Sequence, residues 1–134
     1  MEENIRFTKV AIKKDHDSLH INSSKNRVTG FVTVYNFIDK DTKQSVLYAP
    51  SFDLSSYGDS NEKALIMLKA SLADLFRNLL KMTKDELRSE LTRLGWGKDK
   101  FRNKDFSNSS VGVDGNLENF NADENKVERF ALVA

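Results

Sequence analysis

A stretch of alternating basic residues with aromatic neighbours is the part of this sequence whose residue types most suggest a ligand. Its rings and cations are Trp96, Lys98, Lys100, Phe101, Arg102 and Lys104. In an extended chain the four cations, at every second position, would project to one side and neutralise phosphates while an aromatic ring stacks on a base. The alternative is a solvated charged loop, because 21 basic and 20 acidic residues give a net charge of only +1 and no wider attraction for nucleic acid.

Carboxylates and histidines are the other candidate groups. Asp53 and Asp59 would be metal ligands of a small nuclease if the fold brought them together, although Asp59 is also well placed to cap a helix. His16 and His20 stand four residues apart, the spacing of two metal ligands on one helix face. Their segment lacks a helical pattern and a third ligand. A solvated loop is therefore the preferred interpretation of the histidines.

Other catalytic machinery has no signature in the sequence. The chain contains no cysteine, which excludes thiolate metal sites and a cysteine nucleophile. No nucleophile elbow, phosphate-binding loop or dinucleotide fingerprint occurs. We therefore expect a protein that is not an enzyme and that uses no cofactor and no metal.

Strands are predicted where β-branched and aromatic residues cluster or alternate. These segments are residues 5–12, 28–38, 45–49 and 127–133. Both the odd-numbered and the even-numbered positions of the second segment carry apolar residues, which predicts a central strand that is buried on both faces. Pro50 ends the third segment, because proline cannot donate to a β-ladder. The polar residues 13–26 are expected to be a loop or an irregular hairpin connection, and residues 97–125 a long loop with at most one short element.

A long helix is predicted after these strands. Apolar residues at 3.6-residue spacing over residues 64–79 indicate a helix that begins after Ser60 and ends near Lys81. Ile66 and Leu80 widen the apolar stripe. The helix is therefore expected to be covered over much of its surface.

A second, shorter helix follows the first. Thr83 and Glu86 have the spacing of a capping box, in which each residue satisfies a free N–H group of the other. Gly95 is typical of the position just past a helix end. The side chains expected to point inward are Leu87, Leu91 and Leu94.

The strand–turn–helix segment of residues 48–64 resembles the signature of HicB-type antitoxins. In that family a strand leads to a proline, a hydrophobic residue, a glycine, a small acidic or polar pair, and a helix with an early Glu and Ala. The residues in those places are Pro50, Leu54, Gly58, Asp59, Ser60, Glu62 and Ala64. The resemblance covers residues 28–80, with residues 127–133 as an added strand.

The resemblance implies a β-β-β-α-β fold similar to a reduced ribonuclease-H core without a nuclease site. Proteins of this family neutralise a small ribonuclease toxin by binding its surface and blocking its catalytic histidine, and they commonly self-associate. Many carry a helix-turn-helix or ribbon-helix-helix tail that binds DNA. No such unit is recognisable after Leu94, which implies a solitary or divergent member of the family.

These observations combine into one expectation about fold and domains. The fold class is α+β, with an antiparallel three- to four-stranded sheet in β-β-β-α-α-β order and a long helix packed on one face. Residues 1–94 and 126–134 form one domain, to which residues 95–125 belong as a polar extension. The start of the chain lacks the pattern of a secretory signal, and no apolar stretch approaches the roughly 20 residues that span a bilayer. A cytoplasmic location without a membrane partner is expected.

The expected function is the non-enzymatic binding of a small ribonuclease toxin. Contact would be made through the exposed edge of the last strand, at Arg129, Phe130 and Leu132, and through the loop of residues 97–125. A homodimer along the same edge is also expected. The alternative is single-stranded RNA or DNA binding by residues 96–106.

Overall fold

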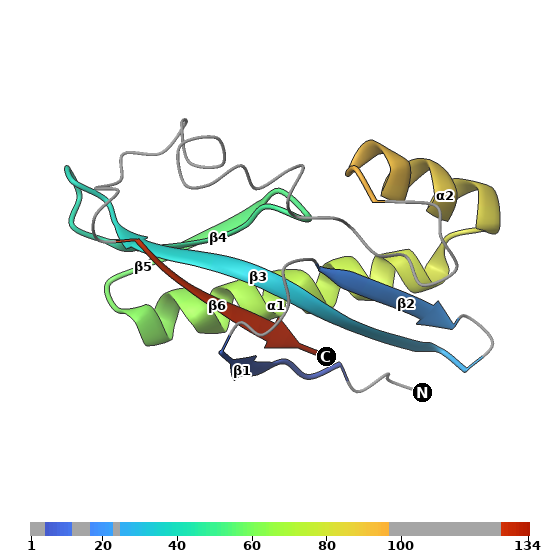
Figure 1. Cartoon of the computed structure of the whole chain (residues 1–134), viewed down its shortest axis with the longest axis horizontal. Helices are drawn as coiled ribbons and strands as arrows, with labels where there is room; N and C mark the ends of the chain where they lie inside the picture. Colours follow the sequence, from blue (N-terminus) through green and yellow to red (C-terminus); the bar gives the residue numbers. More distant parts are fainter. Residues whose placement is uncertain (1–4, 12–16, 23–24, 97–126) are drawn as a thin grey trace.

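The computed structural model of the chain describes residues 5–11, 17–22, 25–96 and 127–134. Within them, six strands form one antiparallel sheet and two helices follow the fifth strand (Figure 1). The strands are β1 (Thr8–Val10), β2 (Ser18–Asn22), β3 (Arg27–Ile38), β4 (Ser45–Ala49), β5 (Leu54–Gly58) and β6 (Glu128–Val133); the helices are α1 (Asn61–Lys81) and α2 (Lys84–Arg93). The predicted α+β class and antiparallel sheet are confirmed, but the sheet has more strands than expected.

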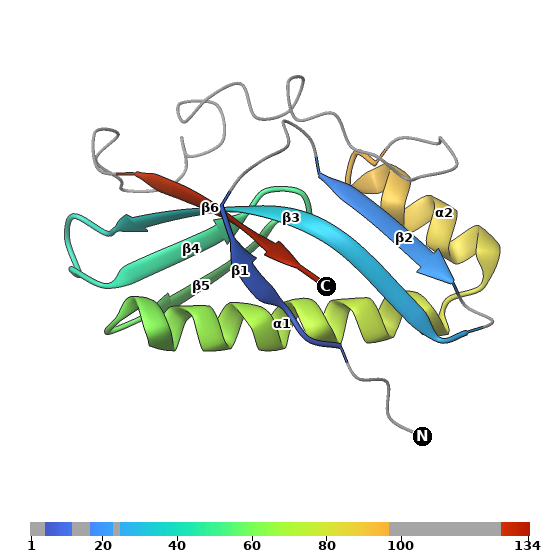
Figure 2. The same cartoon turned by 60° about the horizontal axis from the view of Figure 1, so that its bottom comes forward.

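The sheet is built around β3, its longest strand. Its order is β1-β6-β3-β4-β5, and β2 pairs with the first part of β3. Figure 2 shows β6 running between β1 and β3. The expectation that the last strand offers an exposed edge is wrong along Ala131–Val133, because β1 pairs with those residues.

The main core lies between α1 and one face of the sheet (Figure 2). Val32 and Val34 of β3 and Leu132 of β6 meet α1 side chains such as Leu68 and Phe76 in one buried cluster. The predicted apolar stripe of α1 is confirmed. Its predicted width is wrong at Ile66, which is 68% exposed, because this residue lies on the helix face that points away from the sheet.

The opposite face of the sheet carries a second apolar cluster. Tyr35, Phe37 and Val46 are almost fully buried there, with Tyr48 and Val127 packed against them. Since successive side chains of a strand point to opposite faces, β3 contributes its even positions to the main core and its odd positions to this second cluster. The predicted burial of the central strand on both faces is confirmed.

Both helices begin and end as their sequences predict. The Ser60 side chain accepts from the Lys63 N–H, and Thr83 and Glu86 form the complete capping box. At the end of α2, Gly95 has a positive φ of 90° and the Trp96 N–H donates to the Leu91 carbonyl at 2.9 Å. This pairing across a left-handed residue satisfies carbonyls that the helix leaves without partners. Neither helix of the described residues is long and apolar enough to cross a membrane.

Two strands were not expected from the sequence, and a third is shorter than expected. The supposed loop of residues 13–26 contains β2, and β5 occupies a serine-rich stretch that was assigned to the turn before α1. Of the predicted first strand, only β1 pairs. Residues 97–125, expected to be a loop, lie outside the described residues.

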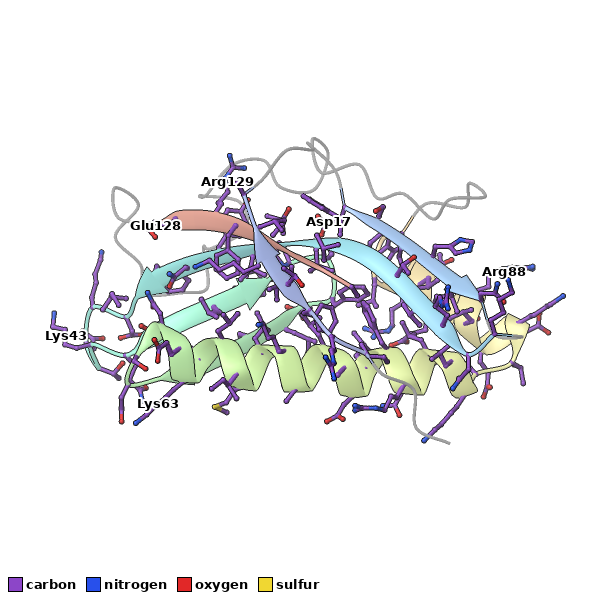
Figure 3. All side chains as sticks on the ribbon, turned by 90° about the horizontal axis from the view of Figure 1, so that it is seen from below. Asp17, Lys43, Lys63, Arg88, Glu128 and Arg129 are labelled. Carbon is purple, nitrogen blue, oxygen red and sulfur yellow. The ribbon has the colours of Figure 1, made fainter. Side chains whose placement is uncertain are left out.

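Asp17 fills a gap along one side of β3. On that side β2 pairs with Arg27–Phe31 and β4 with Tyr35–Ile38, so Thr33 has no strand beside it. The fully buried Asp17 carboxylate takes the place of a strand there: it accepts from the Thr33 N–H at 2.9 Å and from the Thr33 hydroxyl at 2.9 Å. The Ser51 hydroxyl donates to its other oxygen. In Figure 3 Asp17 lies beside β3, where β2 begins.

Replacing Leu68 by alanine tests the packing of α1 on the sheet. Leu68 is fully buried, so we expect the free energy of unfolding to fall by about 2–5 kcal/mol in urea denaturation followed by circular dichroism. The matched control is Ile66→Ala on the outer face of α1, which we expect to change the free energy of unfolding by no more than about 0.5 kcal/mol. A loss at Leu68 as small as that at Ile66 would show that the helix is placed wrongly.

Replacing Asp17 by asparagine tests the gap on β3. An amide would place N–H groups where donors from Thr33 and Ser51 already point, so we expect a loss of about 1.5–3 kcal/mol of unfolding free energy. The control is Asp39→Asn in the exposed turn between β3 and β4, where one oxygen accepts from the Asp41 and Thr42 N–H groups. An amide oxygen can keep both bonds, so a change within about 0.5 kcal/mol is expected. Equal losses at the two positions would contradict the proposed role of Asp17.

Candidate functional site

The strand–turn–helix unit of residues 48–64 contains the residues of the family signature and the two acidic residues predicted as metal ligands. Pro50 follows the last residue of β4, as predicted, and a four-residue turn leads to β5, with Ala49 and Leu54 paired across it. Asp53 ends the turn with a positive φ of 52°, a conformation that Asp adopts more readily than most residues. The side chain of Phe52 points into the core, 5.6 Å from the Phe76 ring and 5.3 Å from the Trp96 ring.

The passage from β5 into α1 is held by close contacts and hydroxyl bonds. The Ser56 hydroxyl donates to the Ala64 carbonyl at 2.7 Å, and the Ser45 hydroxyl donates to the Asn61 side chain at 2.6 Å. A Cβ atom added to Gly58 would lie 2.7 Å from the Ala64 nitrogen, closer than a Cβ atom approaches a backbone atom that it is not bonded to. The sequence-based interpretation of Gly58 and Ala64 as residues that shape this passage is confirmed.

Tyr48 and Asp53 form a hydrogen bond at the other end of β5. The Tyr48 hydroxyl donates to an Asp53 oxygen at 3.1 Å. Burial, and then the charge and hydrogen bond of Asp53, raise the pKa of Tyr48 to about 12. At neutral pH this phenol keeps its proton, so Tyr48 is suited to donate a hydrogen bond and not to act as a general base.

The C-terminal end of α2 places a guanidinium near the same turn. Arg93 donates to both oxygens of Glu90, at 3.0 and 2.7 Å. The hydrogen bond from Arg93 lowers the pKa of Glu90, and the bond to Glu90, with a smaller contribution from the charge of Asp53, raises the pKa of Arg93. Arg93 thus forms its hydrogen bonds with Glu90 and interacts with Asp53 only through the charge of that residue.

The structure does not bring the predicted acidic residues together. Asp53 and Asp59 lie at opposite ends of β5, separated by about 20 Å of extended chain. His20 is exposed on a strand, not on a helix, and His16 lies outside the described residues. No group of three histidine or acidic side chains that could hold a metal ion occurs in the part of the chain that the structure describes. Asp53 and Asp59 therefore do not form the shared metal site that the nuclease interpretation requires.

The predicted partner-binding residues of β6 divide between the two faces of the sheet. Phe130 and Leu132 are buried in the main core, and the Phe130 ring also lies 4.5 Å from the Lys9 ammonium. Arg129 is exposed on the opposite face (Figure 3). Two of the three residues are therefore packing residues, and only Arg129 is free to meet a partner through its side chain.

The predicted nucleic-acid-binding residues cannot use Trp96 as a stacking platform. Trp96 is only 3% exposed, because it folds back against Phe52 and Leu91 at the end of α2. The remaining members, Lys98, Lys100, Phe101, Arg102 and Lys104, lie outside the described residues.

The feature that the sequence did not indicate is the free edge of β5. In the described residues β5 pairs with β4 alone, and Ser55 and Tyr57 are exposed on the face opposite α1. An unpaired strand edge presents N–H and C=O groups that can bind another extended chain. The sequence Leu-Ser-Ser-Tyr-Gly does not alternate between polar and apolar residues, so nothing local separates this strand from the turn that follows.

Titration of Tyr48 tests the contact with Asp53. Its raised pKa means that the protonated phenol contributes stability that is fully present below pH 10, the ordinary pKa of a tyrosine, and is lost as the pH rises toward 12. In Asp53→Asn we expect the pKa of Tyr48 to fall but to stay above its ordinary value, because burial is the largest cause. The pKa of Tyr48 is measured from tyrosinate absorbance as the pH is raised, and the Tyr48→Phe variant assigns the signal to this residue. An unchanged pKa in Asp53→Asn would contradict the contact.

Comparison with family models, with curated proteins and with solved structures found no match for this chain. The resemblance to HicB-type antitoxins therefore depends on the residues of the strand–turn–helix unit.

Proposed function

We propose that this chain is a non-catalytic protein-binding module of the HicB antitoxin type, whose partner is a small ribonuclease toxin. The observation that carries the proposal is that the serine hydroxyls in and around the strand–turn–helix unit are buried and hydrogen-bonded within the fold. Ser45, Ser51 and Ser56 are buried, and each donates its hydroxyl hydrogen to another group of the fold. These hydroxyls stabilise the scaffold and are out of a substrate's reach.

Ser51 and Asp17 are the pair that most resembles an activated nucleophile and its base. A nucleophilic serine needs a base and also access to substrate. Both residues are fully buried, and the same carboxylate holds the Thr33 N–H and hydroxyl. This favours a structural role for the pair and a binding role for the protein.

The class of partner comes from the resemblance over residues 48–64. In that family the partner is a ribonuclease whose active site is blocked by contact with the antitoxin. The residues that match the signature here build a turn and a helix start, which is consistent with a scaffold that displays a surface. Self-association, also implied by the resemblance, is part of the same proposal.

Co-expression with the product of the adjacent reading frame tests the proposed function. We expect a short, toxic protein with an essential histidine, growth that recovers when this chain is present, and a complex that elutes as one species in size-exclusion chromatography. A toxin variant without the histidine serves as the control, since it should form the same complex without toxicity.

A different outcome would favour the alternative function. Failure to form that complex, together with binding of single-stranded RNA that weakens steeply as salt rises, would replace the antitoxin proposal by nucleic-acid binding, because release of counterions from phosphates makes such binding salt-dependent.

A further inference from the structure

Three strands lie at the margins of the sheet in the described residues, and β5 is one whose own residues give it no protection against pairing. β1 is three residues long with Lys9 at its centre, and β2 carries the exposed His20. β5 has the sequence Leu-Ser-Ser-Tyr-Gly, with neither a charge nor a proline. Charged residues, prolines and very short strands are the usual devices that keep edges from pairing. The edge of β5 has none of them.

The edge of β5 is also held ready in an extended form. All five of its residues are in register with β4, from Leu54 opposite Ala49 to Gly58 opposite Ser45. The Ser56 bond to Ala64 and the close approach of Gly58 to α1 fix it from the helix side. A partner strand would therefore meet an ordered edge, and the conformational entropy lost on binding would be mainly that of the partner segment.

Exposed apolar side chains border this edge on both faces. Tyr57 of β5 is 45% exposed on the face opposite α1. On the helix side, Met67 is 54% exposed and lies one turn after Lys63 and Ala64, the residues that contact Gly58. An added strand would have an apolar neighbour for the side chains on each of its faces.

Charges around the edge are mostly negative. The exposed residues Asp53 and Asp59 flank β5, and Glu62 and Lys63 follow in the first turn of α1. Lys63 lies 4.0 Å from Asp59 and offsets part of this charge. At the other end, Arg93 donates its hydrogen bonds to Glu90. The edge thus combines an uncharged centre with carboxylates at both ends.

This charge pattern decides between two occupants. In an antiparallel pair of two copies centred on Ser56, Asp53 of one chain would face Asp59 of the other at both ends, and like charges directly opposite are destabilising. A strand that carries Lys or Arg at both ends would meet opposite charges instead. The carboxylates therefore favour a basic partner over a second copy.

We propose that β5 binds an extended segment of a partner protein as an additional strand, and that this segment is uncharged at its centre and carries a Lys or Arg at each end. The inference rests on the proposed protein-binding function and assigns the surface that performs it. The two cations are expected six residues apart, the spacing of Asp53 and Asp59 along the neighbouring strand.

Two fluorescent peptides test the proposal on the full chain. They are Lys-Thr-Val-Thr-Val-Thr-Lys and the same peptide with Glu at both ends. In fluorescence anisotropy at low salt, we expect the basic peptide to bind about tenfold more tightly than the acidic one. Each terminal Lys would form an ion pair with a carboxylate of the protein, whereas each terminal Glu would be repelled by it. In NMR spectra the basic peptide should shift the backbone amides of β5. Equal affinities, or shifts confined to other elements, would overturn the proposal.

A lysine on the edge provides a second test that leaves the core intact. Ser55 is exposed, so Ser55→Lys should fold normally and weaken binding of the basic peptide by at least about tenfold, because it adds a like charge to the edge. The matched control is Ser89→Lys on the exposed side of α2, which should bind as the unchanged protein does. Self-association that is abolished by Ser55→Lys would overturn the proposal in favour of a second copy.

The edge assignment and the proposed function fail in different ways. If the protein captures the neighbouring gene's product and Ser55→Lys captures it equally well, the proposed function stands and the edge assignment is overturned. If the basic peptide binds at β5 but that product is not captured, the edge assignment is supported and the toxin partner is excluded.

Discussion

The fold depends on how the two sides of β3 are filled. On one side β6 pairs with Phe31–Asn36, and on the other β2 and β4 share the strand but leave Thr33 between them. A buried N–H group without a partner is costly, so something must accept from Thr33. Asp17 does so from the segment before β2, and its second oxygen reaches Ser51 in the turn after β4. One carboxylate thereby connects three parts of the chain that are far apart in sequence.

The sequence predicted those elements whose signals are local. Both helices were predicted because their caps and apolar spacing lie within a few residues of one another, as with Thr83 and Glu86. β3 and β4 were predicted because β-branched and aromatic residues mark a strand that is buried on both faces. Ile66 was misjudged because an apolar residue on a helix does not by itself indicate a covering partner, and the sheet covers only one face of α1.

The missed strands, and most of the candidate site, depend on contacts between distant parts of the chain. β2 and β5 each have five residues with only two apolar or aromatic side chains, and they are strands because β3 and β4 offer hydrogen-bonding partners in the right register. Asp17 could not be recognised as a buried acceptor, since nothing in its neighbourhood in the sequence indicates the gap beside Thr33. The residues of β6 were taken for an exposed edge because the sequence does not say that β1 pairs with it. A strand's position in a sheet is a property of the whole chain.

A match to a short sequence signature says less about a protein's function than about its local structure. Gly58, Ser60 and Ala64 are constrained by a close helix approach and a helix cap, and any protein with this strand-to-helix passage needs similar residues whatever it binds. Function has to be argued from a site and not from a fold. In the described residues the hydroxyls of this passage are committed to the scaffold, whereas the backbone groups on the outer edge of β5 have no strand beside them. The passage fixes α1 against one face of β5, and the outer edge of β5 is the surface that we propose for a partner.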